Sequence, residues 1–198
     1  MRTEYHEELG IRSAGCCERK ELLRIARQAL EEGVYGRPLS RPDLDALPKR
    51  LRENGACFVT LYCGDQLRGC VGALEPRQPL AEEVRVQAVA AALQDYRFPR
   101  VQIEDLPGLK ISISLLARPR RLAYACPEEL ISRLRPGIDG VVLKDGFQRA
   151  TFLPQVWDKI PDKALFLSTL CQKMGASENL WRSKLLEVLT YQVEEFHE

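Results

Sequence analysis

Two predicted β-hairpins constrain the fold of this chain more than any other feature. Residues 56–74 contain two stretches of β-forming side chains separated by a glycine-containing turn at residues 64–66. A second hairpin is predicted over residues 141–153, around the turn residues Asp145 and Gly146. Strands that follow one another in hairpins are antiparallel, whereas alternating strands and helices favour a parallel sheet. The pattern therefore predicts an α+β fold with a mostly antiparallel sheet flanked by helices.

The rest of the chain shows helical and extended patterns. Four helices are predicted, over residues 18–32 with Gly33 as the end, from Pro79 to near Asp95, over residues 127–134 and over residues 164–174. Two further strands are predicted, over residues 110–116 and 185–196. The strand at 110–116 alternates apolar and polar side chains, so it should be half-buried. The helix after Pro79 has a narrow face of small side chains, including Ala88 and Ala91, which should pack closely on a sheet.

The size and charge of the chain limit its class. With 198 residues, it has room for one large domain or two closely packed lobes. The formal net charge is +1, so no basic excess favours nucleic acid and no acidic excess favours a basic partner. No apolar run approaches the roughly 20 residues that span a bilayer, and the acidic N-terminal residues are unlike a signal peptide. We therefore expect a cytoplasmic protein that binds neither nucleic acid nor a membrane.

The cysteines and histidines do not follow a metal-binding pattern. The chain has 7 cysteines and 2 histidines, and no two cysteines form a C-x-x-C pair. His6 and His197 lie at opposite ends of the sequence, so neither a metal site nor a Cys–His catalytic dyad is predicted. No glycine-rich phosphate loop is present, and no cofactor is predicted. In a reducing compartment the cysteines should be mostly free thiols.

The segment Leu67-Arg-Gly-Cys-Val-Gly, an LRGC motif, is the strongest candidate for a functional site. Gly69 and Gly72 leave the backbone uncrowded, so that a ligand can approach it closely. Arg68 is a permanent cation that could favour a thiolate at Cys70, or bind an anion through its planar guanidinium. Two other interpretations stay open: Cys70 as a small buried packing residue, and Arg68 as an ordinary surface arginine.

Five blocks of the chain together resemble one family. They are Leu67-Arg-Gly-Cys-Val-Gly, Ala90-Ala-Ala-Leu-Gln-Asp-Tyr-Arg-Phe-Pro, Leu106-Pro-Gly-Leu-Lys-Ile-Ser-Ile-Ser-Leu-Leu, Arg135-Pro-Gly-Ile-Asp-Gly and Ala150-Thr-Phe-Leu-Pro-Gln-Val-Trp. In this order they resemble the AMMECR domain family over residues 20–196, and the last two blocks are most similar to its prokaryotic branch, AmmeMemoRadiSam system protein A. The resemblance implies one domain over residues 18–196, built of a larger and a smaller interlocked lobe, with residues 1–17 as an N-terminal extension.

The resemblance also implies which residues surround Cys70. It places Asp95 and Arg97 near the thiol, where Arg97 would clamp an anion and Asp95 would act as a base or orient an arginine. The alternative is an ion pair that fixes the exit of the preceding helix. Ser114 shares a strand face with Ser112, either as a polar wall of the cleft or as the solvent face of an edge strand. Ser112 departs from the family pattern, in which a glutamate is frequent, and this weakens the case for a self-sufficient enzyme.

The sequence thus favours an accessory or modifying component. The resemblance implies that it acts with a Memo-like protein and a radical SAM protein, and a cleft at Cys70 and Arg68 would hold a small anionic ligand. The alternative is a self-sufficient enzyme in which Cys70 serves as nucleophile or as thiol acid/base. Fast, selective alkylation of Cys70 would favour the enzyme, and a large exposed apolar patch would favour docking.

Overall fold

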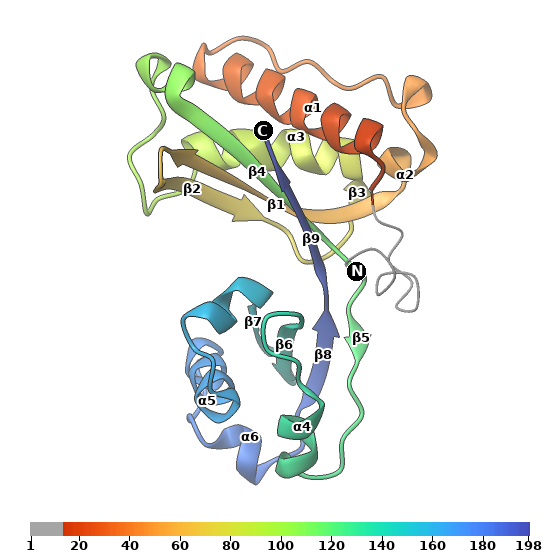
Figure 1. Ribbon diagram of the computed structural model, residues 1–198, viewed down its shortest axis with the longest axis vertical. Coiled ribbons are helices and arrows are strands. Elements are labelled where there is room, and N and C mark those ends of the chain that lie inside the picture. Colours follow the sequence, from red (N-terminus) through yellow and green to blue (C-terminus); the bar gives the residue numbers. More distant parts are fainter. Residues whose placement is uncertain (1–13) are drawn as a thin grey trace. The chain divides into compact units, whose positions relative to one another are not determined.

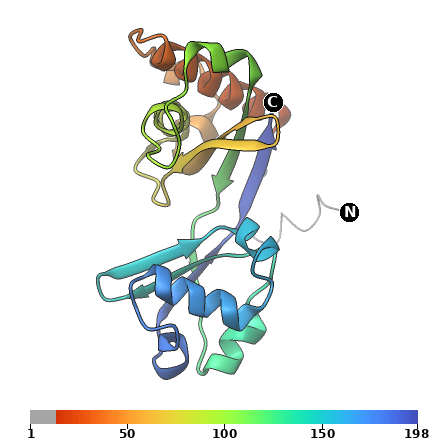
Figure 2. The same cartoon turned by 90° about the vertical axis from the view of Figure 1, so that its left-hand side faces the viewer.

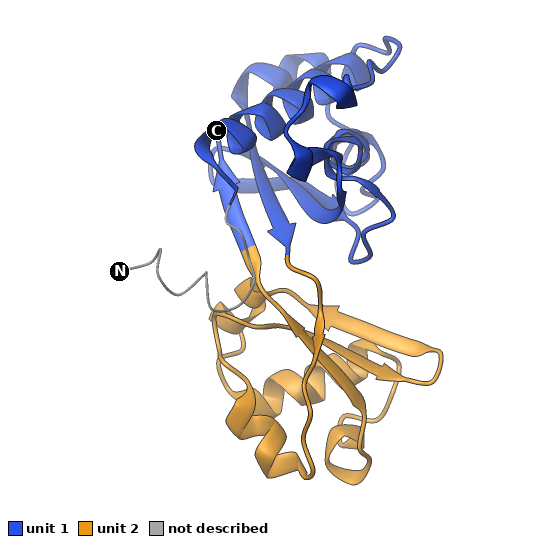
Figure 3. Ribbon diagram, turned by 90° about the vertical axis from the view of Figure 1, so that its right-hand side faces the viewer, with its two compact units in different colours: residues 1–116, 194–198 blue, residues 117–193 orange. Residues whose placement is uncertain are grey.

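The computed structural model describes residues 14–198 and divides them into two units (Figures 1 and 3). Of the described residues, unit 1 comprises 14–116 and 194–198, and unit 2 comprises 117–193. Unit 2 is therefore inserted into the sequence of unit 1, because the chain leaves unit 1 after Leu116 and returns to it at Glu194. The candidate site residues named above, from Arg68 to Ser114, all belong to unit 1.

Unit 1 contains a 5-stranded sheet with helices packed on one face (Figures 1 and 2). Its strands are β1 (Asn54–Cys63), β2 (Gln66–Gly72), β3 (Gln78–Pro79), β4 (Leu109–Leu116) and β9 (Val193–His197). They lie in the order β2-β1-β4-β9, with β3 beside β1, and β1 pairs antiparallel with β2, β3 and β4. The helices are α1 (Cys16–Val34), α2 (Lys49–Arg52) and α3 (Leu80–Leu93), with 3₁₀ segments at Leu44–Ala46 and Ile103–Gly108.

The core of unit 1 lies between the sheet and helices α1 and α3. Alternate residues of β1 and β4 are fully buried on the side of the helices: Cys57, Val59, Leu61, Ile111 and Ile113. The small side chains of α3, among them Ala88 and Ala91, are buried against them. A helix with such a narrow face comes close to the strands beneath it, and this closeness decides the role of Gly69 below.

Unit 2 has its own 4-stranded sheet and its own core. Its strands are β5 (Arg120–Arg121), β6 (Gly140–Asp145), β7 (Gln148–Phe152) and β8 (Glu187–Tyr191), in the order β5-β8-β6-β7. Its helices are α4 (Pro127–Arg133), α5 (Lys163–Lys173) and α6 (Leu180–Ser183), with a 3₁₀ segment at Pro154–Asp158. Helix α5 lies along the β6–β7 hairpin (Figure 2). In the core, the rings of Trp157 and Phe166 stack with centroids 3.6 Å apart, and Trp181 is fully buried.

The predicted α+β class with antiparallel sheets and flanking helices is confirmed, as are both hairpins. One strand prediction is wrong: residues 185–196 form two strands, of which β8 joins the sheet of unit 2 and β9 joins the sheet of unit 1. Both halves are extended, so the local pattern could not separate them. The half-buried prediction for 110–116 is also wrong, because β4 lies between two other strands and its residues are buried on both faces.

Helix α1 is longer than predicted at both ends. It begins at Cys16 and continues through Gly33 to Val34, and the left-handed backbone position is Gly36, with φ of 68°. Residues 1–13 of the predicted N-terminal extension lie outside the described residues. No helix among residues 14–198 combines the length and hydropathy needed to cross a membrane.

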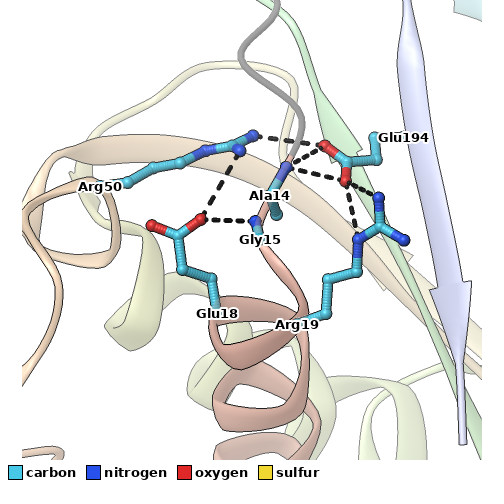
Figure 4. A network of polar contacts seen from close by, with 6 residues as sticks. All are labelled: Ala14, Gly15, Glu18, Arg19, Arg50 and Glu194. Carbon is cyan, nitrogen blue, oxygen red and sulfur yellow. Dashed lines mark hydrogen bonds and ion pairs between the residues drawn. The ribbon is translucent and has the colours of Figure 1, made fainter. Parts of the chain in front are cut away.

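Polar contacts fasten the start of β9 to the start of α1 (Figure 4). The carboxylate of Glu194 accepts a hydrogen bond from the backbone N–H of Ala14 at 2.9 Å and one from Arg19 Nε at 3.0 Å. It also pairs with Arg19 Nη2 at 2.8 Å and with Arg50 Nη2 at 3.4 Å. Glu194 is the residue at which the chain re-enters unit 1, so these contacts hold the returning strand in its sheet.

Candidate functional site

The side chains of Asp95 and Arg97 form hydrogen bonds with the backbone of Cys70. Asp95 Oδ2 accepts a hydrogen bond from Cys70 N–H at 2.8 Å, and Arg97 Nη2 donates to the Cys70 carbonyl oxygen at 2.8 Å. The two side chains also pair with each other, with Arg97 Nε 2.8 Å from Asp95 Oδ1 and Nη2 2.7 Å from Oδ2. We call these three residues the Cys70 clamp.

The Cys70 clamp completes an edge of the unit 1 sheet. Strand β2 is the last strand in the order β2-β1-β4-β9, and Cys70 lies opposite Thr60 of β1. The N–H and C=O of Cys70 bond to a carboxylate and a guanidinium, where a further strand would otherwise pair with them. The sequence left two interpretations of Asp95 and Arg97 open: an ion pair at the exit of the helix, or a position beside Cys70. In the structure, one set of contacts fits both interpretations.

Asp95 is a hydrogen-bond acceptor in this clamp. Its side chain is only 4% exposed. The Arg97 guanidinium, together with the backbone N–H groups of Cys70 and Arg97, holds the pKa of the Asp95 carboxyl well below its usual range. A carboxylate with a lowered pKa is a weak proton acceptor. The geometry therefore disfavours the base role predicted for Asp95 and fits the alternative, in which it orients an arginine.

Arg97 is only partly occupied by its contacts within the clamp. Its side chain is 50% exposed, and the hydrogen bond to Asp95 raises its pKa. The Nε and Nη2 groups bond to the clamp, whereas Nη1 bonds to no protein group among residues 14–198. The guanidinium also lies over the ring of Phe98, 5.5 Å from its centroid. Because Nη1 makes no bond within this part of the protein, the anion-binding role of Arg97 stays a prediction.

Arg68 forms an ion pair with Asp105 and not with the Cys70 clamp. Its Nη2 donates to Asp105 Oδ2 at 2.9 Å, and its Nη1 donates to the carbonyl oxygen of Pro99 at 3.4 Å. This ion pair neutralises the cation that the sequence assigned to the Cys70 thiol. The guanidinium that interacts electrostatically with the Cys70 side chain is that of Arg97. Arg68 thus connects β2 to the segment that follows α3, and its anion-binding role stays a prediction.

Gly69 and Gly72 are required for packing, and their predicted role in ligand binding stays a prediction. A β-carbon at Gly69 would lie 2.0 Å from the carbonyl oxygen of Ala91 in α3. A β-carbon at Gly72 would lie 2.4 Å both from the carbonyl oxygen of Cys57 and from the ring of Phe58. Protein atoms thus fill the space beside each glycine. The missing side chains let α3 and β1 approach β2.

A row of polar side chains crosses the sheet on the face opposite the helices. Thr60 lies opposite both Cys70 and Ser112 in the register, and directly opposed residues share a face. Its hydroxyl donates to Cys70 Sγ at 3.2 Å, and the Ser112 hydroxyl donates to Glu195 Oε1 of β9 at 2.8 Å. Four neighbouring strands thus contribute one group each. We call Cys70, Thr60, Ser112 and Glu195 the polar row, and the face that carries it the open face.

Tyr62 joins the open face, although the sequence analysis did not select it. It follows Thr60 by two residues on β1, so both side chains lie on the same face. Burial raises the pKa of its phenol, and the negative charges of Glu195 and Cys70 raise it further. The alternation of Phe58, Thr60 and Tyr62 in the predicted hairpin was a usable signal for this residue.

Ser112 and Ser114 are both 4% exposed. They belong to β4, which lies between β1 and β9, so the edge-strand interpretation of Ser114 is wrong. Alternation in sequence reports which residues share a face, and it does not report whether the strand lies at an edge. Within the described part of the chain, the Ser114 hydroxyl has no hydrogen-bond partner.

Among residues 14–198, no group of three or more His, Cys, Asp and Glu side chains is arranged to hold a metal ion. His6 lies outside the described residues, and His197 is in β9. The seven cysteines are free thiols, with Cys70 partly buried and Cys63 and Cys126 exposed.

The fold and the site define an α+β protein of two units with a clamped cysteine at the edge of one sheet. A profile of the AMMECR1 family matches residues 23–196. The chain is 36% identical over 192 residues to a protein of Thermofilum pendens, covering 89% of this chain and 88% of that protein. It is 35% identical over 187 residues to a protein of Methanothermobacter thermautotrophicus, covering 91% and 94%. The crystal structure of the uncharacterized protein PH0010 from Pyrococcus horikoshii is similar at a TM-score of 0.80 and 32% identity, covering 89% of each chain. The chain belongs to the AMMECR1 family, which confirms the resemblance seen in the five blocks.

Proposed function

We propose that this chain is an accessory or modifying component that acts with partners of the Memo-like and radical SAM classes and presents Cys70 to them. The Cys70 clamp carries the proposal. Asp95 and Arg97 each hydrogen-bond to the backbone of Cys70, so they position the thiol. A partly exposed thiol held at a sheet edge can meet a group that a partner brings.

A feature beside the clamp supports docking of a partner protein. Tyr96 lies between Asp95 and Arg97 in the sequence and is 96% exposed. The turn that carries it is held by the buried Asp95 and by a hydrogen bond from Phe98 N–H to the Asp95 carbonyl oxygen at 3.1 Å. A tyrosine on a rigid turn loses little conformational entropy when it enters a partner, and tyrosine is enriched at interface hot spots.

The small anionic ligand of this proposal is assigned to the Arg97 side of the clamp. The Nη1 group, which the clamp does not use, offers two donors to a carboxylate or a phosphate oxygen. Arg68 is neutralised by Asp105, so its part in the predicted cleft passes to Arg97.

A second candidate is a self-sufficient enzyme that uses Cys70 as nucleophile or as thiol acid/base. Two contacts favour it: Thr60 donates a hydrogen bond to Cys70 Sγ, and the Arg97 guanidinium interacts with the same side chain. Both contacts help to fix the position of the thiol. In addition, Glu195 brings a carboxylate to Ser112, the position at which members of the family often have a glutamate.

Titration calorimetry with purified Memo-like and radical SAM proteins from the same genome tests the first proposal. We expect at least one partner to bind, and the bound partner should slow alkylation of Cys70 by iodoacetamide. Alkylation of the exposed Cys63 and Cys126 should not change, which makes them internal controls. Tyr96→Ala should weaken partner binding, whereas Tyr35→Ala, at another exposed tyrosine, should not. Absence of binding to both partners would refute the accessory role.

A further inference from the structure

We propose that unit 1 binds a phosphate group in a pocket beside helix α1, through Arg41 and Arg85. The phosphate is either the free anion or the end group of a small phosphorylated molecule. None of the residues around this pocket belongs to the Cys70 clamp or to the polar row. The inference therefore goes beyond the proposed function and does not depend on it.

Three segments of unit 1 surround the pocket: helix α1, the loop that leads from α1 toward α2, and Arg85 of α3 (Figure 1). Helix α1 contributes Arg24, Gln28 and two buried apolar residues, and the loop contributes residues 40–43. The pocket has a volume of about 90 Å³, well below the roughly 300 Å³ at which drug-sized ligand sites begin. It therefore has room for a small group such as phosphate and not for a whole nucleotide.

Hydrogen bonds hold the loop against α1, so the pocket is formed before a ligand binds. The carboxylate of Glu32, near the end of α1, accepts hydrogen bonds from the backbone N–H and from the hydroxyl of Ser40, each at 2.7 Å. Gln28 donates to the same carboxylate at 2.9 Å, and its amide oxygen accepts from Arg24 Nη1 at 3.0 Å. A preformed site loses little of its binding free energy to ordering of the protein.

Arg85 supplies a pair of donors that the protein leaves unused. Its side chain is only 13% exposed, and its Nε donates to Glu82 Oε2 at 2.7 Å. Among residues 14–198 its two Nη groups bond to no protein group. Arg50 Nη1 is the side-chain atom in that range that is sealed from solvent without a partner, so the Nη groups of Arg85 are accessible. A guanidinium in this state offers the parallel donors that phosphate oxygens accept.

Arg41 adds a second cation to the same pocket. Its side chain is exposed, and no hydrogen bond, ion pair or ring contact joins it to another of the described residues. An arginine on a loop can reach an anion held by Arg85, because its long side chain is not fixed by another contact. The two guanidinium groups therefore favour an anion that accepts several hydrogen bonds at once, as phosphate does.

The carboxylates near the pocket are engaged by protein donors. Glu21 and Glu82 each form an ion pair with an arginine that lines the pocket, at 2.7 Å in both cases. Asp43 lines the pocket, and its Oδ1 accepts a hydrogen bond from the backbone N–H of Asp45 at 3.2 Å. The lining thus contains three arginines and one aspartate. Its formal charge is positive, which favours an anionic ligand over a cationic one.

Titration calorimetry of the full chain with inorganic phosphate, at constant ionic strength balanced with chloride, tests the proposal. Arg85→Lys keeps the charge beside Glu82 and removes the paired Nη donors, whereas Arg41→Ala removes an exposed cation. Each should weaken phosphate binding about tenfold. Arg118→Ala is the matched control, because Arg118 is an exposed arginine of unit 2 with no partner among the described residues, and it should not change the affinity. A parallel titration with glycerol phosphate distinguishes the two sources, since the tighter ligand shows whether the site prefers the free anion or the ester.

The variant Arg97→Gln separates this pocket from the anionic ligand of the proposed function. We expect it to leave phosphate binding unchanged, because Arg97 does not line the pocket. Loss of binding in Arg97→Gln, with full binding in the two pocket variants, would overturn the inference and place the anion at the Cys70 clamp. Absence of binding by both phosphate compounds would also overturn it, without bearing on partner binding. Circular dichroism of each variant shows whether it is folded, and the exposed Arg41 is the position least able to disturb the fold.

Discussion

Gly69 lies directly beneath α3, and no other residue in the LRGC motif has so little room. A β-carbon there would meet the carbonyl oxygen of Ala91 at 2.0 Å, and a backbone atom of a packed helix cannot move aside cheaply. Arg68 in the same motif is held by Asp105. The motif therefore combines packing at the glycine with an ion pair at the arginine.

Gly69→Ala should destabilise the protein by about 2 kcal/mol or more, since overpacking costs roughly 1–3 kcal/mol. Urea unfolding followed by circular dichroism would measure the change in free energy of unfolding. Gly108→Ala is a suitable control, because a β-carbon there would lie 3.6 Å from Cys63 Sγ, an ordinary contact. Equal unfolding midpoints for the two variants would contradict the close approach of α3.

Asp95→Asn should lower stability at neutral pH by about 1–3 kcal/mol, because hydrogen bonds to a charged group are lost. The Arg97 guanidinium lowers the pKa of Asp95 in the folded state, so the unfolded chain binds more protons near its own pKa of about 4. The stabilisation is therefore present above about pH 4 and is lost as the pH falls toward the lowered folded pKa.

Unfolding of wild type and Asp95→Asn at several pH values tests this prediction. The difference between them should shrink in acid, and Asp65→Asn, at an exposed turn, should show no such trend. A difference that is the same in acid and at neutral pH would mean that Asp95 does not stabilise the fold through its charge.

Among the elements, β9 depends most on polar contacts. Glu194 binds Ala14, Arg19 and Arg50 at one end of the strand, and Glu195 binds Ser112 on the open face. Phe196 adds an apolar anchor in the core of unit 1. Sequence alternation recognised the extended conformation of 185–196, but both halves have it, so the choice of sheet depends on contacts made far away in the chain.

Glu194→Gln should loosen β9 and raise amide exchange over residues 193–197 about tenfold, because a charged, largely buried acceptor loses its ion pairs. Hydrogen–deuterium exchange measured by mass spectrometry would report this. Glu53→Gln is the control, since its pair with Lys49 is exposed and spans 3.9 Å. Unchanged exchange in β9 would show that Phe196 and the strand pairing are sufficient.

At the scale of the whole molecule, the two units have separate cores and carry different spectroscopic probes. The chain has 2 tryptophans, Trp157 and Trp181, and both lie in the core of unit 2. Tryptophan fluorescence therefore reports unit 2, whereas far-ultraviolet circular dichroism reports the helices and strands of both units.

We expect the two signals to give different midpoints in urea, because each unit buries its own apolar residues. Coincident transitions at all denaturant concentrations would show that the units unfold as one cooperative body. The Gly69→Ala variant sharpens the test: it should shift the circular dichroism transition and leave the fluorescence transition in place, since Gly69 belongs to unit 1.

The sequence by itself determined the hairpins, most helices, the α+β class and the family, because turns, periodicity and ordered motifs are local properties of a chain. It also selected Cys70, Asp95 and Arg97. Only the tertiary structure decided that Asp95 and Arg97 bind the backbone of Cys70, which lies 25 and 27 positions away in the sequence. It also decided that β4 is an interior strand and that Glu195 hydrogen-bonds to Ser112. These features depend on which distant segments pair and bury one another, and periodicity within a segment carries no information about its neighbours in space.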